Sequence, residues 1–194
     1  FPRENPDSTF WSKPLIGVNK ALKETGHYGI VGEKYLFDQF ERSSFKKQTD
    51  RIIQNEPDAV LIAPFYYEET VRLIEYCKQR KIPFVFINSN FQDNSKLSYV
   101  GQDSKQSGYL AARLMSYSIN QGSKLLIINI SRVLDNHKHI LNRQTGFESF
   151  FRENTNHNID IINHYIRDTD KNSISNSLNE TFSKLSQIKG VFVT

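Results

Sequence analysis

Hydrophobic residues along this chain follow two alternating spacings. Apolar residues three or four positions apart predict amphipathic helices, whereas short and almost continuous apolar runs predict buried strands. The first helical stripe runs from Trp11 to Leu22 and is followed by Gly26, a residue typical of helix ends. Helices and strands then alternate to the last residue. The segments that predict strands are "YGIVGEKYLF", "DAVLIAPF", "IPFVFINSN", "LSYVGQD", "SKLLIINI", "IDIINHYIR" and "IKGVFVT".

The helical stripes also predict which side chains face the core. They consist of Trp11, Leu15, Val18 and Leu22; Phe45, Thr49, Ile52 and Ile53; Val71, Ile74 and Cys77; Leu110, Leu114 and Tyr117; Ile140, Phe147 and Phe151; and Ile174, Leu178, Phe182 and Leu185. Strands such as "AVLIA", "FVFI" and "LLIINI" are apolar on both sides, which is typical of parallel strands covered by helices on both faces. The pattern therefore predicts an α/β fold with parallel, doubly wound sheets.

A second series of strands and helices begins near Asp103 to Gly108. We therefore expect an N-terminal lobe at residues 1–103 and a C-terminal lobe at residues 104–194. The chain opens on "FPREN", which looks like the tail of a strand, and stops on the apolar "GVFVT" with no helix to cover it. Both ends predict a segment of a longer protein, truncated before Phe1 and after Thr194.

Composition narrows the class of protein. The chain has 194 residues, of which 38% are hydrophobic and 24% charged, and this is the profile of a globular protein. No apolar run approaches the roughly 18 residues of a membrane span. A single cysteine, Cys77, excludes an internal disulfide. The net charge of +4 comes from basic residues spread along the chain, which does not indicate a nucleic-acid-binding face within it.

Catalytic signatures are absent from the sequence. The glycines of "GHYGIVG" do not make a dinucleotide fingerprint, and neither a phosphate-binding loop nor a nucleophile elbow is present. His137 and His139 lie close together beside Asp135, but nothing completes a metal site, so we expect a solvated loop. Cys77 lies among apolar residues and is expected to be a packed thiol. The sequence thus predicts no enzyme, no metal and no cofactor.

The ends of the predicted strands carry most of the candidate binding residues. Ligands of open parallel sheets bind outside the carboxyl ends of the strands. Phe65, Asn88 and Asp103 stand at such ends, and amides, a carboxylate and an aromatic ring are suited to binding hydroxyl groups. Two structural alternatives stay open: Asp103 as the N-cap of the helix that follows, and Asn88 as a turn residue.

Two adjacent aromatic residues, Phe10 and Trp11, stand where the first helix begins. Neighbours on a helix point about 100° apart, so both cannot face one core. Trp11 fits the buried stripe, which leaves Phe10 freer to stack on a ligand, although the reverse assignment is possible. The alternative for Phe10 is a hydrophobic staple at the helix start.

Five segments follow one another in an order that resembles a known superfamily. They are "NPDSTFWSKPLIGVNKALKETGH", "EPDAVLIAPF", "KIPFVFINSN", "YVGQDSKQSGYLAARLM" and "NRQTGFESF". Their order and spacing resemble the type I periplasmic-binding-protein superfamily, and most of all the effector-binding domains of lactose-repressor-type (LacI/GalR) transcription regulators. The resemblance covers essentially the whole chain and implies a two-lobed periplasmic-binding-protein-like fold.

The resemblance also implies site residues. Phe10 and Trp11 take the place of the family's ligand-contacting aromatic pair, and Asn88 takes the place of an aspartate often found there. Asp103 matches the aspartate of the "V--D---G" motif, whose glycine, Gly108, allows close packing of its helix. Arg143 matches the arginine of "R--GF" and would offer a planar fork of donors to ligand oxygens. Its alternative is an exposed helix arginine.

The function implied by the resemblance is that of a sensor. A small polyhydroxylated effector, a sugar, would bind between the two lobes of the domain and control DNA binding by a helix-turn-helix outside this segment. The protein would be a cytoplasmic homodimer with no membrane partner. A first rival is the periplasmic sugar-binding protein of an ABC transporter, or the sensor domain of a hybrid two-component kinase. A second rival is an enzyme of the doubly wound class, which the missing catalytic signatures argue against.

Overall fold

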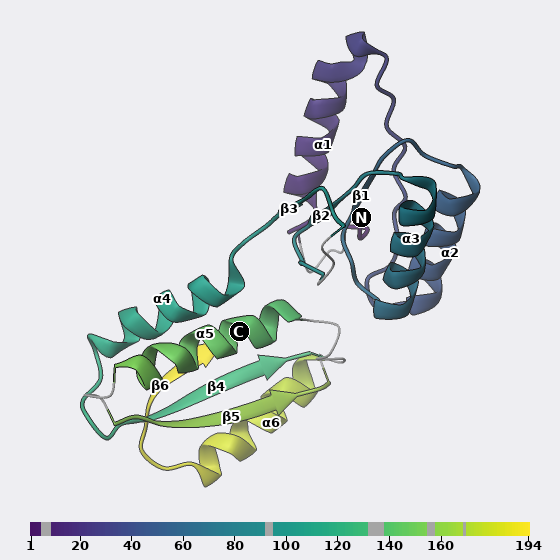
Figure 1. Cartoon of the computed structure of the whole chain (residues 1–194). Helices are drawn as coiled ribbons and strands as arrows, with labels where there is room; N and C mark the ends of the chain where they lie inside the picture. The colour runs from purple at the N-terminus through teal and green to yellow at the C-terminus, as the bar shows by residue number, and fades with distance from the viewer. Residues whose placement is uncertain (5–8, 92–94, 132–137, 155–157, 169) are drawn as a thin grey trace. The chain divides into compact units, whose positions relative to one another are not determined.

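The computed structural model describes residues 1–4, 9–91, 95–131, 138–154, 158–168 and 170–194. It contains two compact units, Phe1–Val100 and Gly101–Thr194. Each unit is an α/β structure built on a three-stranded parallel sheet (Figure 1). The predicted α/β class with parallel sheets is confirmed in both units.

The first unit places its strands in the order β1-β2-β3. Val60 pairs with Phe84 and Val85 pairs with Ser98, so neighbouring strands run in the same direction. The elements of this unit are α1 (Ser12–Thr25), the short 3-10 helix η1 (Gly26–Tyr28), α2 (Arg42–Gln54), β1 (Val60–Ile62), α3 (Tyr67–Arg80), β2 (Phe84–Ile87) and β3 (Ser98–Val100).

The core of the first unit lies between the sheet and helices α2 and α3. Phe86 from β2, Leu73 from α3 and Phe45 from α2 are almost fully buried there. Leu61, which points to the other side of β1, is exposed, and α1 buries none of its residues fully. We predicted helices packed on both faces of this sheet. Among the described residues, helices pack closely on one face only.

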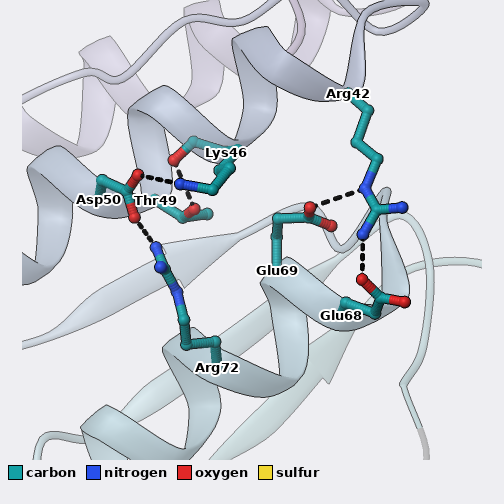
Figure 2. A network of polar contacts seen from close by, with 7 residues as sticks. All are labelled: Arg42, Lys46, Thr49, Asp50, Glu68, Glu69 and Arg72. Carbon is teal, nitrogen blue, oxygen red and sulfur yellow. Dashed lines mark hydrogen bonds and ion pairs between the residues drawn. The ribbon is translucent and has the colours of Figure 1, made fainter.

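Ion pairs join α2 to α3 (Figure 2). Arg42, at the start of α2, pairs with Glu68 and with Glu69, its Nε lying 2.7 Å from Glu69 Oε1. Asp50, one helical turn before the end of α2, pairs with Lys46 and with Arg72 of α3. The pair of Arg42 with Glu68 is exposed, and pairs of this kind contribute at most about 1 kcal/mol. Glu69 differs, because its side chain is buried.

The segment "YGIVGEKYLF" is not a strand, contrary to the sequence prediction. Within the described residues it forms only one bridge, between Pro2 and Phe37, supported by hydrogen bonds from Phe37 N to Phe1 O and from Arg3 N to Phe37 O. A strand needs a hydrogen-bonding partner along its length. Ile30 and Val31 have none alongside and are exposed.

The second unit places its strands in the order β5-β4-β6, with β4 in the middle. Helices α4 and α5 lie on one side of this sheet and α6 on the other (Figure 1). Leu125 and Ile127 of β4 pack with residues of α4 and α5, and Leu126 and Ile128 pack with residues of α6. All four are buried, as the continuous apolar run predicts. The elements are α4 (Ser104–Ser116), β4 (Lys124–Ile130), α5 (Lys138–Glu153), β5 (Asp160–Ile166), α6 (Lys171–Lys184) and β6 (Ile188–Val193).

Helix α4 buries a different face from the one that its apolar stripe predicts. Leu110, Leu114 and Tyr117 are exposed, whereas Gly108 and Ala112 are buried. The face with small residues is buried because the backbones of α4 and α5 are in contact, and only small side chains fit between the two helices.

Candidate functional site

The aromatic residues at the start of α1 divide between core and surface. Trp11 occupies the N-cap position and is 4% exposed, whereas Phe10 is 54% exposed. The Phe10 ring lies edge-on to the Trp11 ring, with centroids 5.2 Å apart. On another side, the Trp11 ring lies 6.1 Å from that of Phe65. Trp11 is therefore an anchor of the core, and Phe10 offers a free aromatic face beside it.

Phe65 and Asn88 lie at one edge of the first sheet. Phe65 follows β1 and Asn88 follows β2, and these two strands are parallel neighbours, so their carboxyl ends share that edge. Phe65 is half-buried and packs on Phe37 as well as on Trp11. The sequence-predicted residues of the first unit are thus brought together in part, through Trp11 and Phe65.

Asn88 is a turn residue, as one of the alternatives proposed. Its φ of 68° lies in the left-handed region, which asparagine tolerates better than most residues. Its backbone N–H donates to Val100 O and its carbonyl accepts a hydrogen bond from the Tyr99 hydroxyl, both at 2.9 Å. These bonds hold the backbone of Asn88 against β3 and fix the place from which its amide side chain projects.

Asp103 caps α4. Its Oδ1 accepts a hydrogen bond of 2.9 Å from the backbone N–H of Gln106, which satisfies one of the unpaired donors at the helix start. The N-cap alternative for Asp103 is confirmed. A carboxylate has about four acceptor sites, so capping does not use up its capacity to accept bonds from a ligand.

Arg143 lies on α5 beside the start of α4. Its Nη2 donates to Gln102 Oε1 at 2.9 Å, and Gln102 directly precedes Asp103. The two predicted site residues of the second unit, Asp103 and Arg143, are therefore brought to one place. Arg143 is half-buried.

Two glycines, Gly108 and Gly146, allow α4 and α5 to pack with their backbones in contact. A Cβ atom on Gly108 would lie 1.9 Å from the backbone oxygen of Arg143, and one on Gly146 would lie 1.9 Å from that of Lys105. Since neither distance is sterically possible, both positions need glycine. The close packing expected of Gly108 is present, and it is the backbone of Arg143 itself that Gly108 contacts.

Four further polar residues lie near the carboxyl ends of the strands in the second unit, and the sequence did not predict them: Asn129, Gln144, Tyr165 and Thr194. Asn129 on β4 is fully buried, and its Nδ2 donates to Gln144 Oε1 at 2.8 Å. Thr194 Oγ1 donates to Asn129 Oδ1 at 2.7 Å, and Tyr165 OH donates to Gln144 Oε1 at 3.2 Å. One signal was available, because Asn129 interrupts the apolar run "LLIINI".

Cys77 is a packed thiol, as predicted. It is 1% exposed, and burial raises its pKa to about 11. Since the thiolate is the nucleophile, Cys77 is unreactive near neutral pH.

The described residues hold no group of three or more potential metal ligands. Asp135 and His137 lie outside the described residues. Within the ranges that the structure describes, no helix combines the length and apolar character needed to cross a membrane.

The chemistry of these residues is that of recognition. Phe65 and Asn88 follow parallel strands of the first unit, and in the second unit Arg143 of α5 lies beside the start of α4. Such groups are typical of an α/β ligand-binding protein. Residues 2–194 match the model of the periplasmic binding protein domain family, and the chain belongs to this family. Comparison with curated protein sequences gives no match.

Solved structures share the fold at low identity. One is from Bacteroides fragilis and is assigned as a LacI transcriptional regulator (23% identity, TM-score 0.76, covering 99% of this chain and 66% of that one). Another is GanP, a glucose-galactose binding protein from Geobacillus stearothermophilus (19%, 0.79, 99% and 66%). A third is the fructose-binding periplasmic domain of a hybrid two-component system (13%, 0.76, 96% and 60%). The chain thus spans about two thirds of their length or less.

Proposed function

We propose that this chain is the effector-binding part of a sugar-responsive transcription regulator of the LacI type. Phe10 would stack on the apolar face of a sugar ring, and Asn88, Asp103 and Arg143 would bond its hydroxyl groups. Phe65 would support the ring at the first sheet, with Trp11 behind it. The chain would bind its ligand without converting it chemically.

The observation that carries this proposal is the pairing of Arg143 with the Gln102–Asp103 corner. A guanidinium and a carboxylate beside each other, with an amide between them, present donors and acceptors to adjacent hydroxyl groups. A site for a strongly charged ligand would instead carry side chains of the opposite charge only. Similar structures are named for the binding of glucose and galactose, of fructose and of tagatose, which supports a sugar.

The mechanism would follow from closure around the ligand. A sugar that binds the closed form more tightly than the open form shifts the equilibrium by that difference in affinity. In a cytoplasmic homodimer, this shift would alter the placement of helix-turn-helix modules outside the chain and so their affinity for DNA. The Bacteroides fragilis structure supports this output.

A second candidate is a periplasmic sugar-binding protein or the sensor domain of a hybrid two-component system. It is favoured by neighbours of both kinds with TM-scores as high as that of the regulator. The ligand chemistry would be the same, and the compartment and the partner would differ.

One experiment tests the shared part of the proposal and then separates the candidates. The complete protein is titrated by calorimetry with D-glucose, D-galactose, D-fructose, D-tagatose and D-ribose, and we expect saturable binding of at least one. The protein is then tested for sugar-dependent binding to DNA upstream of its own gene. Sugar binding without any DNA binding favours the second candidate, and no binding of any sugar contradicts both.

A further inference from the structure

We infer that Asn129 is a positioning residue that fixes helix α5, and with it Arg143, against the ends of strands β5 and β6; this inference rests on the proposed sugar site. Asn129 is fully buried at the end of β4, where an apolar side chain would be expected. Burying an amide costs free energy unless its hydrogen bonds are satisfied. Both ends of the Asn129 amide are satisfied, on two different elements.

The hydrogen bonds around Asn129 have a defined direction. Glu148 Oε1 accepts from Gln144 Nε2 at 2.8 Å and from Asn163 Nδ2 at 3.0 Å. Because a carboxylate only accepts, it turns the amide of Gln144 so that the oxygen faces Asn129. Asn129 must then present its NH2 group to Gln144 and its oxygen to the hydroxyl of Thr194.

This chain of bonds connects three elements at the end of the sheet where the candidate site lies. Gln144 belongs to α5, Tyr165 to β5, and Thr194 directly follows β6. The Tyr165 hydroxyl also donates to Gln144 Oε1, so this oxygen receives bonds from two strands. Thr194 is held a second time by its backbone, which donates to Ile128 O at 3.1 Å.

The consequence for Arg143 follows from helix geometry. Arg143 and Gln144 are neighbours on α5 and so point about 100° apart. Gln144 is bonded to the sheet, whereas the backbone of Arg143 lies against Gly108 of α4. Contacts on two sides restrain α5 from rotating about its axis, and this fixes the direction in which the Arg143 side chain leaves the helix. Removing the Asn129 bond weakens one side, because only the Tyr165 hydroxyl then ties Gln144 Oε1 to the sheet.

The test is a double-mutant cycle in the complete protein, with the panel sugar that binds most tightly. Asn129→Leu keeps the number and branching of the side-chain heavy atoms and removes the bonds, and we expect affinity to fall about tenfold, the lower end of what supporting residues cost in metal sites. In the Arg143→Ala background, Asn129→Leu should cause no further loss. Loss by the same factor in both backgrounds, or no loss in either, overturns the inference.

Ser149→Ala is the matched control. Ser149 is a buried residue of α5 whose hydroxyl donates to Gly146 O at 2.9 Å, outside the Asn129 network. It should lower the melting temperature and leave affinity unchanged. If it weakens binding as much as Asn129→Leu does, the effect is general loss of stability and the inference fails.

A second variant covers the case in which Asn129→Leu does not fold. Asn129→Asp places an acceptor opposite Gln144 Oε1 when it is ionised, but a protonated carboxyl has the donor and acceptor of the amide. Sugar affinity should therefore be low at high pH and recover as pH falls, unlike that of the unmodified protein. A deficit that does not change with pH contradicts the inference.

If the unmodified protein binds none of the sugars, the proposed function fails and positioning is judged without ligand. The order parameter of the Arg143 Nε–H bond, from 15N relaxation, should fall in Asn129→Leu and stay unchanged in Ser149→Ala. An unchanged order parameter in Asn129→Leu overturns the inference, whatever the ligand.

Discussion

The backbone oxygen of Arg143 lies where the side chain of any residue other than glycine at position 108 would begin, since a Cβ on Gly108 would be 1.9 Å away from it. This contact ties a predicted ligand-binding arginine to the helix that Asp103 caps. The placement of the Arg143 guanidinium beside Gln102 therefore depends on a residue that has no side chain of its own.

Gly108→Ala should destabilise the second unit. The added methyl group meets backbone, which cannot turn aside, so α4 and α5 must separate, at a cost of about 1–3 kcal/mol. Urea unfolding measures this loss. Gly17→Ala is the matched control, because Gly17 lies within α1 with open space around it, and it should stabilise the protein by about 0.5–1 kcal/mol. Equal effects of the two substitutions would contradict the packing described for α4 and α5.

Arg143→Ala should weaken sugar binding by about 1–3 kcal/mol, because hydrogen bonds to a charged group are stronger than those between neutral groups. Titration calorimetry with the tightest-binding panel sugar provides the measurement. Arg152→Ala, in the last turn of the same helix, removes the same charge from an exposed position and should leave affinity unchanged. Unchanged binding by Arg143→Ala would remove this arginine from the site.

Phe10→Ala and Trp11→Ala should have opposite signatures. Phe10 is exposed, so its removal should lower sugar affinity with little change in melting temperature. Trp11 is buried against Phe65, so its removal should cost about 3–5 kcal/mol of unfolding free energy. A large fall in melting temperature for Phe10→Ala with intact affinity would instead favour a hydrophobic staple.

Two substitutions of Asp103 separate its capping role from its binding role. Asp103→Ala removes the cap of α4 and should cost about 0.5–2 kcal/mol of stability. Asp103→Asn keeps a capping oxygen and removes the charge, so it should change stability little but weaken sugar binding. If the asparagine variant binds as tightly as the unmodified protein, Asp103 is a cap alone.

The thiol of Cys77 should make stability depend on pH above neutrality. Its pKa is about 11 in the folded protein, above the value of 9.0 for an accessible thiol, so ionisation favours the unfolded chain. This contribution is complete below pH 9 and is lost as pH rises from 9 towards 11. Urea unfolding at pH 8 and pH 10.5 measures it, and Cys77→Val should reduce the difference. An equal pH dependence in both proteins would contradict the raised pKa.

Much of the fold could be predicted because hydrophobic spacing reports local geometry directly. The run "LLIINI" predicts a strand buried on both faces, and β4 is such a strand between α5 and α6. Trp11 belongs to the helical stripe and is buried, and Cys77 is a packed thiol. The N-cap role of Asp103 follows from a carboxylate before a helix, a signal within four residues.

What only the tertiary structure decided depends on residues distant in the sequence. The segment "YGIVGEKYLF" has the composition of a strand, but a strand also needs a partner strand, and among the described residues of this segment only Phe37 forms a β-bridge. Leu110 and Leu114 have helical spacing, yet the neighbouring helix selected the face that carries Gly108. Asn129 and Gln144 lie 15 positions apart in the chain, and their bond exists only because α5 packs on β4. Spacing along the chain determines which faces are apolar, whereas contact between faces determines which of them are buried and which polar groups meet.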